Sequence, residues 1–303
     1  MRTLEHTLSF ISMVIVFAIA LSCAKREQGE YNKATYASDK KLIEFEAKEL
    51  LRADAQTKVT EVTTANLTSI YVTATKGTPG TSGESVAFAS VNFSKEQTGG
   101  LFRADKMWPE INPKYHFFGS SVAMSFSNGT CTISATNDRD IVCSYQETPV
   151  YGEVNTLVFS HIFARIGTVT FSAPTGYTLS GVTTKLTPKV SGVYNIRTGN
   201  GYTDGTGWSS LVAGSETTLS SSNNNLYLVP GDYTLTVAYT LSRKGTTGVV
   251  EWTKTYTKSA TVSIEAGATN NLSGTVPKGE ASEIQLSVTL SGWEEQNHQP
   301  EFK

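Results

Sequence analysis

Apolar and polar residues alternate with a period of two in several segments of the chain. The clearest segment is residues 233–241, whose apolar positions are Tyr233, Leu235, Val237, Tyr239 and Leu241. The same alternation recurs over residues 41–47, 260–266 and 284–290. Because successive side chains of a strand point to opposite faces, each segment predicts a half-buried strand with one apolar face. We therefore expect an all-β chain.

Turn signals separate these segments. Asn128-Gly129 lies between two short apolar stretches and predicts a tight hairpin, because both residues accept a positive φ. The most apolar stretch after the N-terminal region, residues 157–171, predicts two strands that are broken at Gly167. Residues 173–176 contain Pro174 and Gly176 and predict a turn between two domains.

The predicted strands need sheet partners on their apolar faces. Two facing sheets in each half of the chain satisfy that need. We expect two β-sandwich domains in tandem, residues 41–173 and residues 174–303.

The composition agrees with an all-β chain and argues against a nucleic-acid partner. The 303 residues are enough for two domains, and only 17% are charged, where roughly a quarter is usual. Thr, Ser, Gly and Asn take the place of charge, and these residues favour strands and turns. The net charge is −2 and no basic stripe is present, so we expect no nucleic-acid partner.

Residues 1–22 have the pattern of a bacterial lipoprotein signal peptide. The apolar run from Leu8 to Ala20 is shorter than the roughly 20 residues of a membrane-spanning helix. It ends close to Cys23, which we expect to be acylated and to become the mature N-terminus. The alternative is an ordinary signal peptide with an incidental cysteine. Residues 23–40 are polar and predict a linker.

Two further cysteines, Cys131 and Cys143, lie in the exported part of the chain. Their separation and an oxidising environment allow a disulfide across a hairpin. The alternative is two unpaired buried thiols. The sequence leaves both states open.

The sequence contains no catalytic or metal-binding motif, so we expect a protein that is not an enzyme and has no cofactor. HExxH, Cys-x-x-Cys, Gly-x-Ser-x-Gly and Walker patterns are all missing. His161 lies in an apolar segment, where a hydrogen-bonded core histidine is expected. Asp138, Arg139 and Asp140 lack calcium-loop spacing and predict a solvated turn.

One glycine-rich loop, residues 199–208, contains the chemistry of a sugar contact. Its Tyr202 and Trp208 offer rings for stacking, and Asp204 offers a carboxylate for hydroxyl groups. The alternative, which we favour, is a long surface loop whose aromatic side chains pack on the domain.

The chain resembles the fimbrillin (Mfa-like) family, the type V pilus subunits of certain Gram-negative anaerobes. Five segments in order carry the resemblance: the signal ending at Cys23, an Ile-x-Phe strand at 43–45 followed by Arg52-Ala53, Met107-Trp108-Pro109 leading to residues 115–118, residues 157–166 around His161, and the strand pair of 267–288 ending at Trp293. Together they span roughly residues 20–295.

The resemblance implies a fold and an assembly mechanism. The two domains would be transthyretin-like, and an arginine-specific protease would cut between Arg52 and Ala53 and remove the first strand. The apolar side chains of that removable strand are Ile43, Phe45 and Ala47. The C-terminal strand of another subunit would then fill the groove, by strand addition. The candidate donor residues are Ile284, Leu286, Val288 and Leu290.

We therefore expect a structural subunit of a cell-surface fimbrium that supports adhesion. It would be an outer membrane lipoprotein first and part of the fimbrium later. Its partners would be other fimbrial subunits, the outer membrane through the lipid anchor, and a surface glycan or protein of a host or bacterium. The alternative is a lipid-anchored glycan-binding surface protein that does not polymerise.

Overall fold

The structure is a computed structural model that describes residues 41–49, 67–97, 100–108, 114–135, 140–199, 207–279 and 284–291. Almost all of its regular structure is β-strand, which confirms the predicted fold class. The single helix among these residues is α2 (Ile196–Gly199). None of the described helices is long and apolar enough to cross a membrane.

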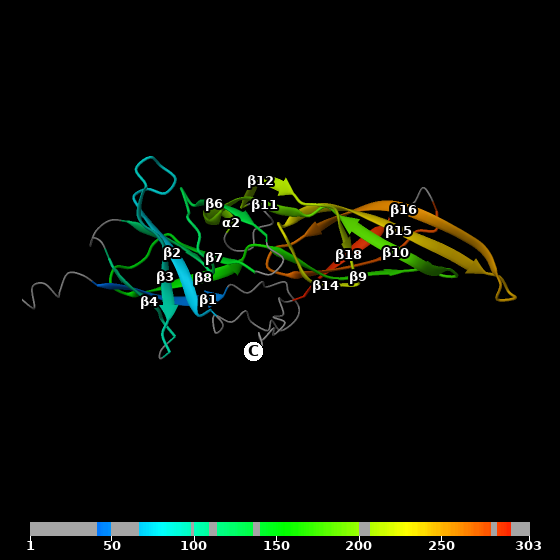
Figure 1. Cartoon of the computed structure of the whole chain (residues 1–303), viewed down its shortest axis with the longest axis horizontal. Helices are drawn as coiled ribbons and strands as arrows, with labels where there is room; N and C mark the ends of the chain where they lie inside the picture. Colours follow the sequence, from blue (N-terminus) through cyan, green and yellow to red (C-terminus); the bar gives the residue numbers. More distant parts are fainter. Residues whose placement is uncertain are drawn as a thin grey trace, which may run out of the picture.

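Seven strands of the N-terminal half form a closed barrel (Figure 1). Hydrogen bonding runs in the order β1-β4-β3-β2-β5-β7-β8 and closes through a parallel pairing of β8 with β1. The strands are β1 (Leu42–Glu49), β2 (Ser69–Lys76), β3 (Ser85–Lys95), β4 (Phe102–Met107), β5 (Tyr115–Ser120), β7 (Val142–Gln146) and β8 (Val154–His161).

Two four-stranded sheets face each other in the C-terminal half. One has the order β13-β10-β15-β16, and the other has the order β14-β9-β17-β18. The first contains β10 (Thr178–Leu186), β13 (Thr217–Leu219), β15 (Gly231–Lys244) and β16 (Val250–Ile264). The second contains β9 (Ala164–Ser172), β14 (Ser222–Leu228), β17 (Thr269–Thr275) and β18 (Gln285–Ser291).

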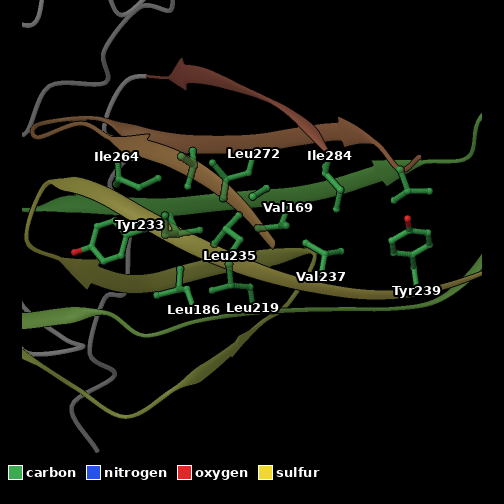
Figure 2. Close-up of a cluster of buried hydrophobic side chains, with 14 of the residues drawn as sticks. Val169, Leu186, Leu219, Tyr233, Leu235, Val237, Tyr239, Ile264, Leu272 and Ile284 are labelled. Atoms are coloured by element: carbon green, nitrogen blue, oxygen red, sulfur yellow. The ribbon is translucent and has the colours of Figure 1, made fainter. Parts of the chain in front are cut away.

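The apolar positions of β15 fill the space between these two sheets. The five alternating residues from Tyr233 to Leu241 are all buried. Figure 2 shows side chains of β15 meeting Val169 of β9 and Leu272 of β17 from the opposite sheet. Alternation therefore predicted the buried face of this strand correctly.

A three-stranded sheet joins the two halves. It has the order β12-β11-β6, with β6 (Thr130–Ser134), β11 (Lys189–Asn195) and β12 (Trp208–Ala213). β9, which precedes the predicted domain boundary at residue 174, pairs with β14 and β17, which follow it. The division into domains at this residue stays a prediction.

The Asn128-Gly129 turn is confirmed, but its expected strand partner is not. Both residues have positive φ, 51° and 76°, and Ser127 and Thr130 exchange backbone hydrogen bonds of 2.9 Å. Before the turn, however, residues 123–126 form no strand, and β6 pairs with β11 instead. The turn is fixed by local chemistry, whereas the choice of strand partner depends on distant residues.

The predicted break at Gly167 was wrong. Gly167 lies inside β9, and the chain breaks at residues 162–163. A Cβ at Gly167 would lie 2.4 Å from Oδ1 of Asn271 and 2.6 Å from Cγ2 of Thr269. Glycine is needed here because the side chains of β17 approach the backbone closely, and not because the strand ends.

Candidate functional site

β1 lies between two other strands and closes the barrel. It pairs antiparallel with β4, where Glu44 lies opposite Arg103 and Phe45 opposite Phe102. It pairs parallel with β8 from Glu44↔Val154 to Glu49↔Phe159. Both edges of β1 therefore take part in hydrogen-bonded ladders. A strand in this position cannot be added at a free edge; it fills a gap between two edges.

The inner face of β1 fills the middle of the barrel core. Ile43 and Phe45 are fully buried, and Ala47 is 8% exposed. The ring of Phe45 meets Phe93 at 4.9 Å and Phe117 at 5.0 Å between ring centroids, both edge to face. Edge-to-face contacts between rings stabilise the core beyond the contribution of burying each ring. The three apolar residues of the predicted removable strand are thus brought together on one face.

The outer face of β1 is held by ion pairs. Glu44 pairs with Arg103 of β4, and Arg103 also pairs with Glu96. The hydrogen bond to Glu96, followed by the charge of Glu44, raises the pKa of Arg103. Glu46 lies 3.1 Å from Nζ of Lys48. All of these groups are solvent-accessible, so water and salt screen each pair and its contribution to stability is small.

The stability that β1 gives to the barrel therefore comes mainly from its inner face. Complete burial of a large apolar side chain contributes about 1.5–3 kcal/mol. Two such residues, Ile43 and Phe45, are buried together with the smaller Ala47. Loss of β1 would uncover an apolar groove and two unpaired backbone edges, on β4 and β8.

β18 has the opposite situation, because it has one strand neighbour among the described residues. It pairs with β17 from Thr275↔Gln285 to Thr269↔Ser291. Ile284, just before the strand, is 5% exposed. Leu286, Val288 and Leu290 are half-buried, while Gln285, Ser287 and Thr289 are exposed. The predicted alternation of residues 284–290 is confirmed, and β18 covers one margin of the C-terminal core.

The described strand lacks two of the devices that usually protect an edge, charged side chains and proline. Its residues 285–291 include no charged side chain and no proline. An edge strand of this kind is a template for pairing with another chain.

Several predicted site residues lie outside the described residues. These are Cys23, Arg52, Ala53, Tyr202 and Asp204. Their assignments to lipidation, proteolytic maturation and ligand contact stay predictions.

Trp208, the third residue of the predicted ligand loop, belongs to a buried cluster. Its ring centroid lies 5.0 Å from that of Tyr194 and 5.2 Å from that of Phe163. Its Nε1–H donates to the carbonyl of Ile162 at 3.2 Å. This ring is engaged in packing, and a ligand contact by the loop of residues 199–208 stays a prediction.

Cys131 and Cys143 are free thiols, the second of the two states that the sequence left open. Cys131 is half-buried and Cys143 is fully buried, in the same cluster as Trp208. Burial raises the pKa of the Cys143 thiol, which disfavours the thiolate form.

His161 is a core residue, as expected, but the neighbouring aspartate is not simply solvated. The His161 ring is 1% exposed and its Nδ1 pairs with Oδ2 of Asp140. The predicted solvated turn is therefore wrong at Asp140, because this side chain turns inward to a buried imidazole. Residues 138 and 139 lie outside the described residues. Among the described residues no cluster of His, Cys, Asp or Glu could hold a metal ion.

Sequence analysis missed Arg103 as part of this site. On β4, Phe102 is buried and the next residue, Arg103, is half-exposed, so the arginine lies on the outer face of the barrel. Its partners depend on the register between β1 and β4, which no local pattern contains.

Comparison with protein-family models finds no match, and no curated protein matches the chain either. Similar solved structures do exist. A candidate cell adhesion protein from Bacteroides uniformis is 14% identical with a TM-score of 0.43, over 84% of this chain and 98% of its own. A second candidate cell adhesion protein, from Bacteroides ovatus, is 16% identical with a TM-score of 0.46, over 85% and 99%.

A third solved structure is that of a fimbrial assembly protein from Parabacteroides distasonis. It is 12% identical with a TM-score of 0.41, over 84% of this chain and 100% of its own.

Proposed function

We propose that this chain is a structural subunit of a cell-surface fimbrium and that it assembles by strand exchange. Removal of β1 opens the barrel, and the C-terminal strand of a second subunit fills the gap. The proposal rests chiefly on one observation: β1 has strand neighbours on both sides and buries Ile43 and Phe45 completely. Its loss would leave an apolar groove between two free strand edges, which another strand can refill.

The groove would bind its occupant in two ways. The unpaired edges of β4 and β8 would supply main-chain hydrogen bonds, which are independent of sequence. The pockets left by Ile43, Phe45 and Ala47 would select apolar side chains at every second position. Uncovering these pockets to water is unfavourable, so the open barrel has a strong drive to accept a strand.

Residues 284–290 are suited to serve as the donor. Ile284, Leu286 and Val288 have the same spacing as the three inner residues of β1. Among the described residues, the strand would leave its own sheet by breaking one ladder, the ladder with β17. The single ladder and the half-buried side chains make β18 easier to release than a strand with two neighbours.

Export as a lipoprotein would bring the subunit to the surface before assembly. Acylation at Cys23 would hold it in the outer membrane, and cleavage after Arg52 would separate it from both the lipid and β1. Other fimbrial subunits would be its partners, and the finished fimbrium would support adhesion.

The test uses the purified chain with Cys23→Ser, treated with an arginine-specific protease. We expect the first cut after Arg52, followed by self-association, measured by mass spectrometry and by light scattering after size-exclusion chromatography. An Arg52→Gln variant should resist the cut and stay monomeric. Cut protein that remains monomeric at high concentration would exclude strand exchange.

Two matched variants test the donor strand. Leu286→Asp places a carboxylate on the apolar face, and Ser287→Asp places it on the exposed face one residue further. We expect the first to block association of cut protein and the second to permit it. Equal association of both variants would show that residues 284–290 are not the donor.

A further inference from the structure

The β15–β16 hairpin ends in exposed apolar side chains. Val249 is 65% exposed, the highest value for a large apolar residue in the described part of the chain, and Val250 beside it is 50% exposed. Figure 1 shows this hairpin at one end of the long axis, with the barrel at the other end. Nothing in the described fold covers the two valines.

The turn that carries these valines is held by backbone hydrogen bonds. The N–H of Gly245 donates to the carbonyl of Val249 at 2.9 Å, and the N–H of Gly248 donates to the carbonyl of Gly245 at 3.0 Å. Gly248 has a φ of +79°, which glycine adopts without strain. The valines are therefore presented at a fixed position at the tip.

Basic side chains line both strands behind the tip. Arg243, Lys244 and Lys254 are exposed, and Glu251 is the one acidic residue of residues 243–254. Three positive charges against one negative charge give this segment a net charge of +2, whereas the whole chain carries −2. The tip is locally basic on a weakly acidic protein.

An aromatic residue of β16, Trp252, follows the valines along the hairpin, and its partner Tyr177 lies just before β10. Trp252 is half-buried and meets Tyr177 edge to face, with ring centroids 5.7 Å apart. From the tip inward, the hairpin thus carries aliphatic side chains first and then the half-buried Trp252, with basic residues on both strands. Aliphatic groups prefer the hydrocarbon of a bilayer, aromatic rings prefer the headgroup level, and Lys and Arg reach anionic headgroups.

We propose that the tip of the β15–β16 hairpin binds the surface of an anionic phospholipid bilayer. Val249 and Val250 would enter the acyl boundary, and Arg243 and Lys244 would contact the headgroups. A protein partner fits less well, because a stable protein interface buries about 800 Å² on each side and two valines at a turn supply far less. A bilayer needs no complementary shape.

The experiment measures co-sedimentation of the mature chain, from Ala24 onward and without its acyl group, with lipid vesicles. Vesicles of phosphatidylcholine mixed with phosphatidylglycerol are compared with phosphatidylcholine alone. We expect binding to the mixed vesicles only, and weaker binding in raised salt. Absence of binding to the mixed vesicles, or equal binding to both kinds, would overturn the proposal.

Substitutions at the hairpin tip test whether the tip is the part of the chain that binds vesicles. Val249→Asp with Val250→Asp should abolish binding, and Arg243→Gln with Lys244→Gln should weaken it more than about tenfold, since each basic residue near an anionic surface contributes roughly fivefold. Val212→Asp, at a valine of β12 that is 55% exposed, is the matched control and should bind normally. Tip variants that bind like the control would contradict the proposal.

The vesicle experiment is independent of strand exchange, because the uncut chain is used and no assembly is required. Size-exclusion chromatography with light scattering on the same variants, after cleavage by the arginine-specific protease, tests the competing partner, a second copy of the chain. If the tip variants lose self-association and keep vesicle binding, the tip is a contact between copies and the lipid proposal is wrong.

Discussion

Arg197 and Glu84 form a buried ion pair between two parts of the chain that are 113 residues apart in sequence. Glu84 immediately precedes β3 of the barrel, and Arg197 lies in α2, directly after β11. The side chain of Glu84 is 2% exposed and that of Arg197 is 15% exposed. The guanidinium of Arg197 also donates to the carbonyl of Asn128 at 2.6 Å and lies over the rings of Phe118 and Tyr145. The pair therefore links the barrel to the three-stranded sheet.

Replacement of Arg197 by alanine should destabilise the fold strongly. Glu84 would be left as a buried carboxylate without its cation, and breaking a buried pair in this way typically costs about 3–5 kcal/mol. The free energy of unfolding in urea measures the loss. Arg243→Ala removes an exposed arginine and is the control, with an expected change within about 0.5 kcal/mol. Equal losses in both variants would contradict the role of the pair.

The same pair should make stability depend on acid pH. Burial of Glu84 acts to raise its pKa, but hydrogen bonds from Thr75 and Gly80 and the charge of Arg197 together hold it below its usual value. A carboxylate with a lowered pKa in the folded state stabilises the protein above its unfolded pKa, near 4.5. That stability is lost as the pH falls through the folded pKa. The free energy of unfolding, measured over this pH range, should depend less on pH in Glu84→Gln than in wild type. Identical pH slopes in the two proteins would show that Glu84 does not cause the dependence.

His161→Ala should lower stability by about 1–4 kcal/mol. The change leaves a cavity in a buried region and removes the partner of Asp140. Thermal denaturation measures the effect. Val158→Ala, at a 38% exposed position of the same strand, is the control and should change stability much less. A His161→Ala variant that melts like wild type would show that the imidazole has no structural role.

Gly167→Ala should destabilise the sandwich by about 1–3 kcal/mol, because the added Cβ collides with Asn271 and Thr269 of β17. Gly83→Ala is a suitable control, since the nearest atom to its Cβ is Oγ1 of Thr81 at 3.6 Å. Urea denaturation of the two variants separates the effect of close strand approach from the general effect of replacing glycine. If Gly167→Ala is as stable as its control, β17 can move aside without cost.

Cys23→Ser should release the protein from membranes or block its maturation. The reason is that the thiol is the expected acylation site at the end of the signal peptide. Membrane fractionation of cells expressing the variant, with the intact mass of the mature protein, reports the result. Unchanged membrane retention of the variant would exclude the lipoprotein prediction.

Much of the secondary structure could be predicted from local patterns. The strand at residues 233–241, the inner residues Ile43, Phe45 and Ala47, and the two-faced strand at 284–290 all follow from alternation. The Asn128-Gly129 turn follows from the tolerance of these residues for positive φ. These features depend on neighbours within a few positions, so the sequence alone contains the information.

The contacts that make the candidate site were decided by the tertiary structure. Alternation shows which face of β1 is apolar, but not that β4 and β8 enclose the strand on both sides. It gave no sign that Gly167 makes room for β17, that Asp140 meets His161, or that Arg197 meets Glu84. Each of these contacts joins residues that are distant in sequence, and its geometry is set only when all the strands pack at once. The sequence by itself therefore determined the alternating strands and their buried faces, because these depend on near neighbours, while the packing of the whole chain determined where other strands end and which strand covers which face.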